Sequence, residues 1–312
     1  MSSGLSYPSL KCVLEHVEAN KRIYLASRSP TVQRFEKTIP LRLDFLRLNG
    51  LEIQINDITY ATDTIFFANF KGVGFINEKT GYRYKGVAPK KLNSGDRCCK
   101  MSSRLFEGRN SIQVGQLQTK MYRQTKNVPE DFKIYTKNVL TTFDIKEDDI
   151  SLIDPGCFPL EKLQMSVIRN SKTFNLPAVK TAKKLVLIAI QKEEFVKFYS
   201  ILENDVAVFP RLESDDSVLN LVESWVKNQQ TSGIRFFETA GKKDNKKLLD
   251  KVMQKFGGKH VELEVPDKRM VPSSKCIRIT TSSTSSLLFY GSFIEKSDRR
   301  IYLKMKAESH II

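Results

Sequence analysis

The chain has 312 residues, of which 40% are hydrophobic and 28% charged, and its formal net charge is +16. This length and composition are typical of a folded soluble protein with one large or two smaller domains, and they exclude a disordered chain. The longest strongly apolar stretch, Leu185 to Ile190, is far shorter than the roughly 20 residues that cross a membrane. The first residues also lack the pattern of a secretory signal. We therefore expect a cytoplasmic or nuclear protein with no membrane partner.

Cysteines and histidines give no pattern typical of a reactive site. The five cysteines are odd in number and include no C-x-x-C spacing, so we expect reduced thiols and not a disulfide framework or a zinc cluster. The three histidines, His16, His260 and His310, are widely separated in sequence. No nucleophile stands in a motif beside a base, and no phosphate-binding loop is visible. These observations predict a non-catalytic protein that holds no metal and no cofactor.

Apolar residues in the first forty positions recur with helical spacing. Pro8 suits the first turn of a helix, and the positions that follow it at i, i+3, i+4 and i+7 are Leu10, Val13, Leu14 and Val17. A second apolar set starts at Ile23, and the Ser29-Pro30 break precedes a third. The pattern predicts two or three short helices within residues 1–39. With so few apolar groups, this segment must dock on the following sheet or on a partner.

The segment from residue 40 to residue 150 is predicted to be β-rich, antiparallel and basic. Asn49-Gly50 is typical of a two-residue hairpin turn between strands at 41–45 and 51–55. Alternating apolar residues predict further strands at 65–70, 75–76, 82–87, 112–117 and 132–140. Asn93 to Arg109 shows little periodicity and is interpreted as a long loop.

Residues 151–312 alternate between apolar strands and amphipathic helices. Strands are predicted near residues 163, 185, 206, 234 and 261, at a spacing of about 21 to 28 residues. Helices at 218–225 and 245–256 separate the last three of them, which favours a parallel sheet of leucine-rich-repeat-like β–α units. Three closely spaced strands at 276–280, 287–290 and 301–306 are expected to pair antiparallel. The predicted class of the whole chain is α+β.

The positive charge is concentrated in one quarter of the chain. Residues 71–146 contain 16 Lys and Arg against 6 Asp and Glu, a local excess of +10. Such an excess is typical of nucleic-acid binding, with phosphate contacts by Lys85, Lys90, Lys91, Arg97, Arg104 and Arg109. The charges are dispersed, however, and belong to no known nucleic-acid-binding motif. A solvated basic face, or a surface for an acidic protein partner, is the preferred interpretation, and binding of RNA is the alternative.

Several sequence blocks resemble one protein family. They are L-S-Y-P-S-L-K-C-V-L-E (5–15), I-P-L-R-L (39–43), I-D-P-G-C-F-P-L-E-K-L (153–163), L-V-E-S-W-V (221–226) and the terminal L-L-F-Y-G with I-Y-L-K-M-K. Nearly the entire chain is thereby similar to the nematode-expanded F-box-C type proteins. The resemblance implies a degenerate F-box over residues 1–39 and an F-box-associated region of unknown function over 151–312.

This resemblance implies a role in protein recruitment. An F-box binds a Skp-type adaptor of a cullin ubiquitin ligase, and the rest of such a chain recruits a substrate protein, here unknown. The adaptor contacts would be Pro8, Leu10, Val13, Leu14 and Val17. The alternative is that these residues pack as a helical cap over the next sheet, and the exposure of their side chains separates the two possibilities.

Overall fold

The structure is a computed structural model that describes residues 7–50, 52–62, 72–87, 94–119, 132–166, 171–188, 202, 204–209, 215–228, 236–240, 245–262, 276–293 and 301–309. Helices and strands are both well represented, so the predicted α+β class is confirmed. The chain divides into two compact units, Met1–Phe158 and Pro159–Ile312. Within the described ranges, no helix is both long and apolar enough to cross a membrane.

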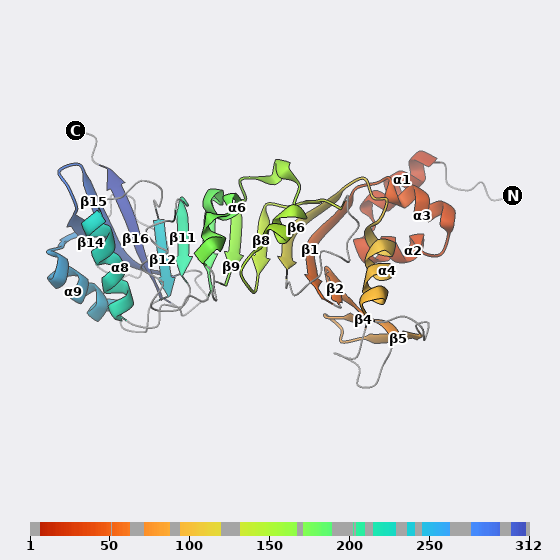
Figure 1. Ribbon diagram of the computed structural model, residues 1–312, viewed down its shortest axis with the longest axis horizontal. Coiled ribbons are helices and arrows are strands. Elements are labelled where there is room, and N and C mark those ends of the chain that lie inside the picture. The colour runs from red at the N-terminus through yellow and green to blue at the C-terminus, as the bar shows by residue number, and fades with distance from the viewer. Residues whose placement is uncertain are drawn as a thin grey trace. The chain divides into compact units, whose positions relative to one another are not determined.

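Three short helices open the first unit, as the apolar spacing predicts: α1 (Tyr7–His16), α2 (Ala19–Ala26) and α3 (Pro30–Lys37). Figure 1 shows them together at the N-terminal end of the chain. Leu14, Phe35 and Ile39 form a small core, against which Leu10 and Val32 pack. The three helices therefore bury part of their apolar surface against one another.

The sheet of the first unit combines antiparallel and parallel pairs. Its strands are β1 (Leu41–Asn49), β2 (Glu52–Ile55), β3 (Ile58–Ala61), β4 (Gly72–Asn77), β5 (Arg83–Val87), β6 (Ile112–Thr119), β7 (Ile134–Tyr135) and β8 (Asn138–Thr141). The order is β8-β6-β1-β2-β3-β4-β5, and β7 also pairs with β6. The helices α4 (Ser94–Phe106) and α5 (Glu147–Ser151) and the 3-10 helix η2 (Pro155–Cys157) complete the described elements.

The prediction of an antiparallel sheet is correct for β1 to β5 and wrong for the strands that follow. β1 pairs antiparallel with β2, whereas β6 runs parallel to β1, β7 and β8. Parallel neighbours need a long connection, and the chain between β1 and β6 contains β2 to β5 and α4. The strand predicted at 65–70 lies outside the described residues.

The predicted hairpin at Asn49-Gly50 is confirmed, with its turn one residue later. Asn49 is the last residue of β1 and pairs with Glu52, so the turn begins at Gly50, whose φ is +52°. The Asn49 amide donates to a Glu52 carboxylate oxygen across the hairpin at 3.1 Å. A second tight turn at Asn56 (φ +49°) leads into β3, and no turn is predicted there from the sequence.

The second unit contains four parallel strands: β9 (Lys162–Met165), β10 (Lys184–Leu187), β11 (Val206–Phe209) and β12 (Phe236–Ala240). The fifth predicted parallel strand is wrong, because β16 (Ile301–Ser309) pairs antiparallel with β12 at the edge that this strand would need. The strand predicted near residue 261 is instead β13 (Lys259–Val261), which pairs antiparallel with β14 (Cys276–Thr280). β15 (Ser285–Phe293) joins β14 to β16 in the predicted antiparallel arrangement.

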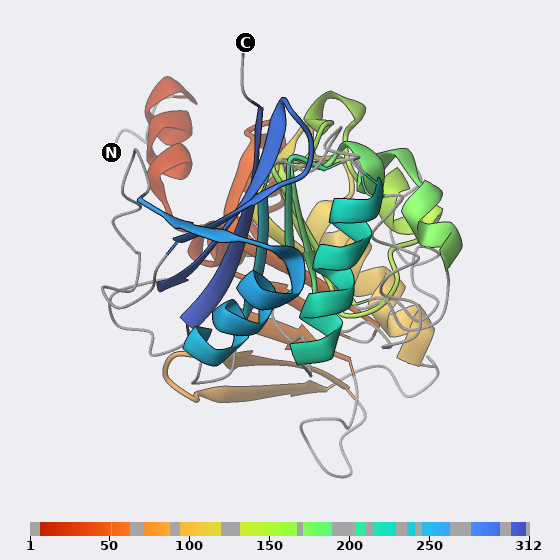
Figure 2. The ribbon, with the colours of Figure 1, turned by 90° about the vertical axis from the view of Figure 1, so that its left-hand side faces the viewer.

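Helices connect the strands of the second unit. The 3-10 helix η3 (Ser171–Asn175) and α6 (Pro177–Thr181) lie between β9 and β10, α8 (Asp215–Asn228) lies between β11 and β12, and α9 (Asn245–Phe256) follows β12. Figures 1 and 2 show α8 and α9 beside each other against the sheet, where α9 contacts β14 and β15. The predicted bounds of α9 agree with the structure, and Gly257, with φ +66°, ends it.

A buried carboxylate lies in the first unit at α5. Asp149 is only 1% exposed. Its Oδ2 atom accepts a hydrogen bond from the backbone amide of Lys146 at 3.0 Å. Burial raises the pKa of Asp149 to about 6, and the Lys146 hydrogen bond opposes that shift. The folded protein therefore holds a proton on this group more tightly than the unfolded chain does.

This raised pKa predicts a specific dependence of stability on pH. Between about pH 4 and pH 6 the folded state binds more protons at Asp149 than the unfolded state, so this group's contribution to stability falls as the pH rises. Asp149→Asn keeps an acceptor oxygen and removes the charge. We expect it to raise the free energy of unfolding at pH 7 by about 1–3 kcal/mol, and to have little effect at pH 4. Urea denaturation at both pH values measures the free energy of unfolding, with the exposed Asp148→Asn as the control. A lower free energy of unfolding of Asp149→Asn at pH 7 would contradict the prediction.

Candidate functional site

The site is built on two helices whose first turns are capped by side chains. Glu18 precedes α2, and its Oε2 accepts hydrogen bonds from the amides of Asn20 and Lys21 at 2.9 and 3.1 Å. Ser29 caps α3, where Pro30 occupies the first helical position. These caps satisfy amide groups that have no partner inside a helix, and they fix where each helix starts.

A buried cluster of charges joins these two helices to α4. The Glu36 Oε1 atom accepts hydrogen bonds from Arg22 Nε and from Arg109 Nη1, each at 2.7 Å. The three side chains are 1%, 4% and 2% exposed respectively. Burial lowers the pKa of Arg22, and the attraction of Glu36 opposes that shift. One carboxylate thus holds two guanidinium groups out of water.

Backbone carbonyls complete the hydrogen bonding of both arginines. Arg22 also donates to the carbonyl oxygens of Glu36, Ile39 and Pro40 at 3.0, 2.7 and 3.0 Å. Arg109 donates through Nε to the Leu105 carbonyl at 2.6 Å, at the end of α4. Because buried charges are tolerated only when they are paired and hydrogen-bonded, this cluster fixes the end of α3 and the end of α4 relative to α2.

The segment from Asn93 to Arg109, predicted to be a loop, contains the helix α4. Cys98, Met101, Leu105 and Phe106 are its buried apolar residues, with the spacing of one helical face. Gly108 adopts a φ of +70° just after the helix, a conformation that glycine takes without strain. The serine, glycine and charge content of this segment concealed the periodicity.

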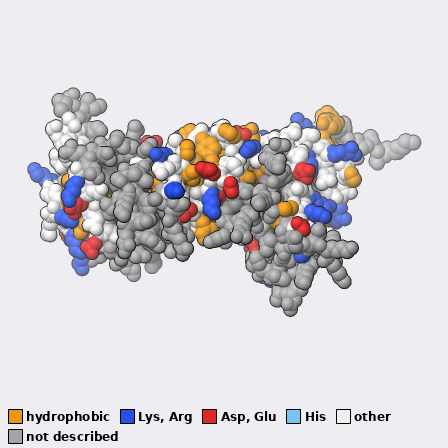
Figure 3. Space-filling view, in the orientation of Figure 1, with side chains coloured by type: hydrophobic (Ala, Val, Ile, Leu, Met, Phe, Trp, Pro, Cys, Tyr) orange, Lys and Arg blue, Asp and Glu red, His pale blue; other side chains and the backbone are white. Residues whose placement is uncertain are grey.

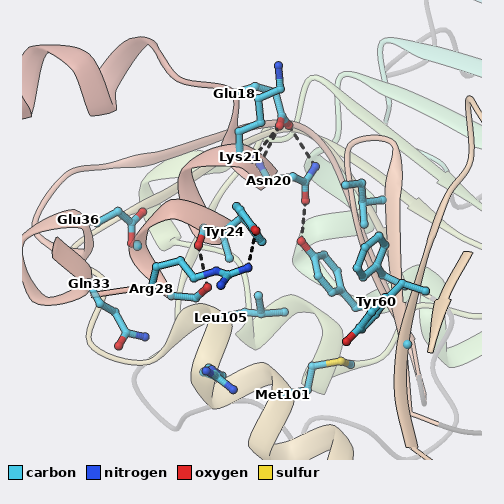
Figure 4. Close-up of a pocket in the computed structure, with 18 of the residues that line it drawn as sticks. Glu18, Asn20, Lys21, Tyr24, Arg28, Gln33, Glu36, Tyr60, Met101 and Leu105 are labelled. Carbon is cyan, nitrogen blue, oxygen red and sulfur yellow. Dashed lines mark hydrogen bonds between the residues drawn. The ribbon is translucent and has the colours of Figure 1, made fainter. Parts of the chain in front are cut away.

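Between α2, α3, α4 and the strands β3 to β5 lies a pocket of about 1030 Å³. Figure 4 shows that Glu18 and Lys21 lie at one edge of it, while Met101 and Leu105 of α4 lie at another. Ile23 and Ala26 of α2 and Ile58 of β3 add apolar surface. All of these residues belong to the first unit of the chain.

Aromatic side chains form part of the pocket's wall. Tyr60 of β3, Phe75 of β4 and Tyr84 of β5 line it, and the rings of Phe75 and Tyr84 are stacked with centroids 5.3 Å apart. On α2, Tyr24 lines it too, and the Arg28 guanidinium lies 4.8 Å from the centre of the Tyr24 ring. Tyr24 and Tyr84 remain 57% and 51% exposed, so large apolar surfaces here stay in contact with water.

A polar network ties the aromatic wall to α2. The Tyr60 hydroxyl donates to Asn20 Oδ1 at 3.0 Å, and Asn20 Nδ2 donates to the Ile55 carbonyl at 2.9 Å and to Glu18 Oε1 at 3.1 Å. Figure 4 shows Asn20 between Glu18 and Tyr60. Burial raises the pKa of Tyr60 to about 12, and the Glu18 charge adds to the shift. Tyr60 is therefore a protonated hydrogen-bond donor at neutral pH.

The six basic residues singled out from the sequence have different environments. Arg97 and Arg104 both line the pocket, but Arg104 is exposed whereas Arg97 is only 8% exposed. Arg109 also lines it, but its side chain is held in the ion pair with Glu36. Lys85 belongs to β5, and Lys90 and Lys91 lie outside the described residues. The proposed phosphate contacts therefore do not form one free basic surface among the described residues.

The five proposed adaptor contacts divide between the interior and the surface. Leu14 is 2% exposed and belongs to the core of the three helices, with Leu10 packed against that core. Pro8 is exposed, Val13 is 47% exposed and Val17 is half-buried. Leu14 is therefore inaccessible in this core, whereas Pro8 and Val13 are exposed.

Sequence reasoning missed Tyr24 and Arg28 of α2 and Tyr60 of β3, which line the pocket. Tyr24 and Arg28 lie four residues apart, a spacing that puts them on one side of a helix and is visible in the sequence. Tyr60 and Tyr84 belong to strands whose pairing brings them near α2, and nothing local in the sequence indicates that proximity. Within the described part of the chain, no group of three His, Cys, Asp or Glu residues could hold a metal ion.

Comparison with known proteins gives one match. A family model described as a domain of unknown function (DUF3557) matches residues 96–239, from within α4 to within β12. The match includes the α4 wall of the pocket and leaves out α1 to α3. No curated protein and no solved structure matches the chain.

The shared carboxylate predicts a large effect of one substitution on stability. Glu36→Ala leaves the Arg22 and Arg109 guanidinium groups buried without their counter-ion, so we expect it to lower the free energy of unfolding by about 3–5 kcal/mol. The exposed Glu107→Ala should change it by less than about 0.5 kcal/mol. Urea denaturation of the two variants beside the parent protein measures the difference. If Glu36→Ala unfolds at the same urea concentration as the parent, the cluster does not stabilise the fold.

Proposed function

We propose that the chain is a non-catalytic, F-box-type binding protein. In this proposal α1 to α3 dock on a Skp-type adaptor of a cullin ubiquitin ligase, and the remainder of the chain recruits a substrate protein. The observation that carries the proposal is the exposed apolar surface of α1, which lies outside the core of the three helices. In Figure 3, hydrophobic side chains are visible on the surface where α1 lies.

Two sides of α1 carry apolar residues with different roles. Leu10 and Leu14 pack with Phe35 and Ile39, so this side closes the core of the three helices. Val13 is 47% exposed, and Val17, which donates its amide to the Val13 carbonyl at 3.1 Å, continues the same side one turn later. A helical cap and an adaptor-binding surface are therefore compatible, because different residues supply them.

The second unit supplies the surface that we propose for the substrate. The parallel strands β9 to β12, with α6 and α8 in their connections, support a β–α repeat-like arrangement similar to that of leucine-rich repeats. Such arrays commonly use a sheet face or the connecting loops to bind other proteins. A protein of this type acts in the cytoplasm or the nucleus, where ubiquitin ligases operate.

Binding of RNA is the second candidate, and the described residues support it less. Its proposed contacts include Arg97 and Arg109, which are largely buried, and only Arg104 is both exposed and described. A nucleic-acid interface needs several accessible cations along the strand. Binding of a labelled oligouridylate to the full chain tests this candidate directly.

A substitution on the exposed side of α1 tests adaptor binding. Val13→Glu places a charge on an accessible apolar position, so we expect it to abolish co-precipitation with a recombinant Skp-type adaptor while the melting temperature stays unchanged. Leu14→Ala is the matched variant on the buried side. It should lower stability by about 2–5 kcal/mol through the cavity it leaves.

Three results of this experiment contradict the proposal. They are no association of the parent protein with the adaptor at micromolar concentration, equal association of the parent and Val13→Glu, and a loss of association only when the protein unfolds. Lys11→Ala, at an exposed position of the same helix, controls for unspecific effects of a surface substitution.

A further inference from the structure

The pocket between α2, α3, α4 and β3 to β5 is large for a small-molecule site. Its volume of about 1030 Å³ lies at the upper limit of the roughly 300–1,000 Å³ that small-molecule sites usually occupy. The pocket is open to solvent through surfaces that include the exposed rings of Tyr24 and Tyr84. This size and exposure suit a segment of a longer chain better than a compact metabolite.

The inner surface of the pocket can hold an apolar side chain. Ile23 and Ala26 of α2 and Met101 and Leu105 of α4 line the pocket, together with the stacked rings of Phe75 and Tyr84. Methionine adapts its shape to different partners, and aromatic rings bury much surface at little cost in conformational entropy. An aromatic or long aliphatic side chain of a ligand would therefore fit among these groups.

Charges around the pocket favour an anionic ligand on the α4 side. The acids in its lining already have internal partners: Glu36 binds two arginines, Asp57 pairs with Lys79 at 2.7 Å, and Glu18 caps α2. By contrast, no described residue forms an ion pair or a hydrogen bond with the side chains of Lys37, Lys100 or Arg104, although these also line the pocket. Cations without internal partners are available to carboxylates of a ligand.

The two signs of charge come from different elements. Glu18 and Asp57 belong to the start of α2 and to the turn before β3, whereas Arg97, Lys100 and Arg104 follow one face of α4 at i, i+3 and i+7. A nucleic-acid strand carries a negative charge at every nucleotide, so it would meet the Glu18 and Asp57 carboxylates with repulsion. A peptide, by contrast, can have acidic residues beside the α4 cations and uncharged residues beside Glu18 and Asp57.

We infer that this pocket binds a peptide segment of a partner protein in which an aromatic or long aliphatic side chain is flanked by acidic residues. The apolar side chain lies among Ile23, Met101, Phe75 and Tyr84, and the acidic residues pair with Lys100 and Arg104. This inference deepens the proposed function, on which it rests, because it names the chemical class of the recruited protein segment. The pocket for this segment belongs to the first unit, in addition to the surface proposed on the second unit.

Fluorescence anisotropy with the full chain tests the inference at low ionic strength. The probe is a fluorescein-labelled peptide with a central phenylalanine between two pairs of acidic residues. The comparison probes are the same peptide with alanine at the centre, the same peptide with lysines for the acidic residues, and a labelled oligouridylate of about fifteen nucleotides. We expect the acidic phenylalanine peptide to bind at least about tenfold more tightly than each of the other three.

Matched charge reversals assign the binding to the pocket. Lys100→Glu combined with Arg104→Glu should weaken binding of the acidic phenylalanine peptide by about tenfold or more. Lys11→Glu combined with Arg34→Glu changes the net charge equally at exposed positions outside the pocket, and it should weaken binding by less than about threefold. Tyr84→Ala should also weaken binding, whereas Tyr135→Ala, at an exposed tyrosine outside the pocket, should not.

Three outcomes of these binding experiments would contradict the inference. Equal effects of the two double variants would show that net charge and not the pocket attracts the peptide. Tighter binding of the oligouridylate, lost with Lys100→Glu and Arg104→Glu, would make the pocket a nucleic-acid site. No binding of the acidic phenylalanine peptide to the folded parent protein would exclude the proposed ligand class.

The test also separates this inference from the proposed function. Val13→Glu should leave peptide binding unchanged, because α1 does not line the pocket, and the Lys100 and Arg104 reversals should leave adaptor binding unchanged. If the adaptor does not bind while the peptide binds in the pocket, the F-box proposal fails and the pocket assignment stands. If the adaptor binds while the peptide does not, the pocket assignment fails and the F-box proposal stands.

Discussion

The first unit depends on one buried carboxylate that two arginines share. Glu36 lies on α3, Arg22 on α2 and Arg109 just after α4, so three segments meet at one oxygen atom. Two buried guanidinium groups beside one carboxylate leave an excess positive charge, which backbone carbonyls of Leu105, Glu36, Ile39 and Pro40 help to stabilise. Moving any of the three segments would separate buried charges, and this constraint fixes their relative positions.

The pocket follows from that constraint. Because α2, α3 and α4 are held at the ion cluster, the remainder of α4 extends past α2 and presents Arg97, Lys100 and Arg104 to the space between them. The strands β3 to β5 close this space with aromatic rings, and the Tyr60 to Asn20 hydrogen bond joins the sheet to α2. Among the cations that suggested a nucleic-acid surface in the sequence, Arg109 has a structural role in the ion pair with Glu36. Arg104, by contrast, is exposed and accessible to a ligand.

Local patterns in the sequence predicted local structure well. The helical spacing of α1, the Asn49-Gly50 turn and the two glycines after α9 each depend on neighbouring residues, and the structure contains all three features. Strand direction depends on distant residues: β6 lies parallel to β1 although β2 to β5 and α4 separate them in the chain, and β16 takes the place of a fifth parallel strand. The contact between Arg109 and Glu36 spans 73 positions of the chain, so no local pattern could indicate it. The pocket combines such distant residues, and only single members such as Arg104 were visible in advance.

Hydrogen–deuterium exchange of Glu36→Gln tests most directly whether the shared carboxylate organises the first unit. The amide side chain keeps the size of glutamate but cannot neutralise two guanidinium groups. The account predicts faster exchange in α2, α3 and the last turn of α4, which contact the cluster, while β9 to β12 of the second unit keep the protection of the parent protein. Unchanged protection in these three helices, or a uniform loss across both units, would contradict the claim that this ion cluster holds the pocket together.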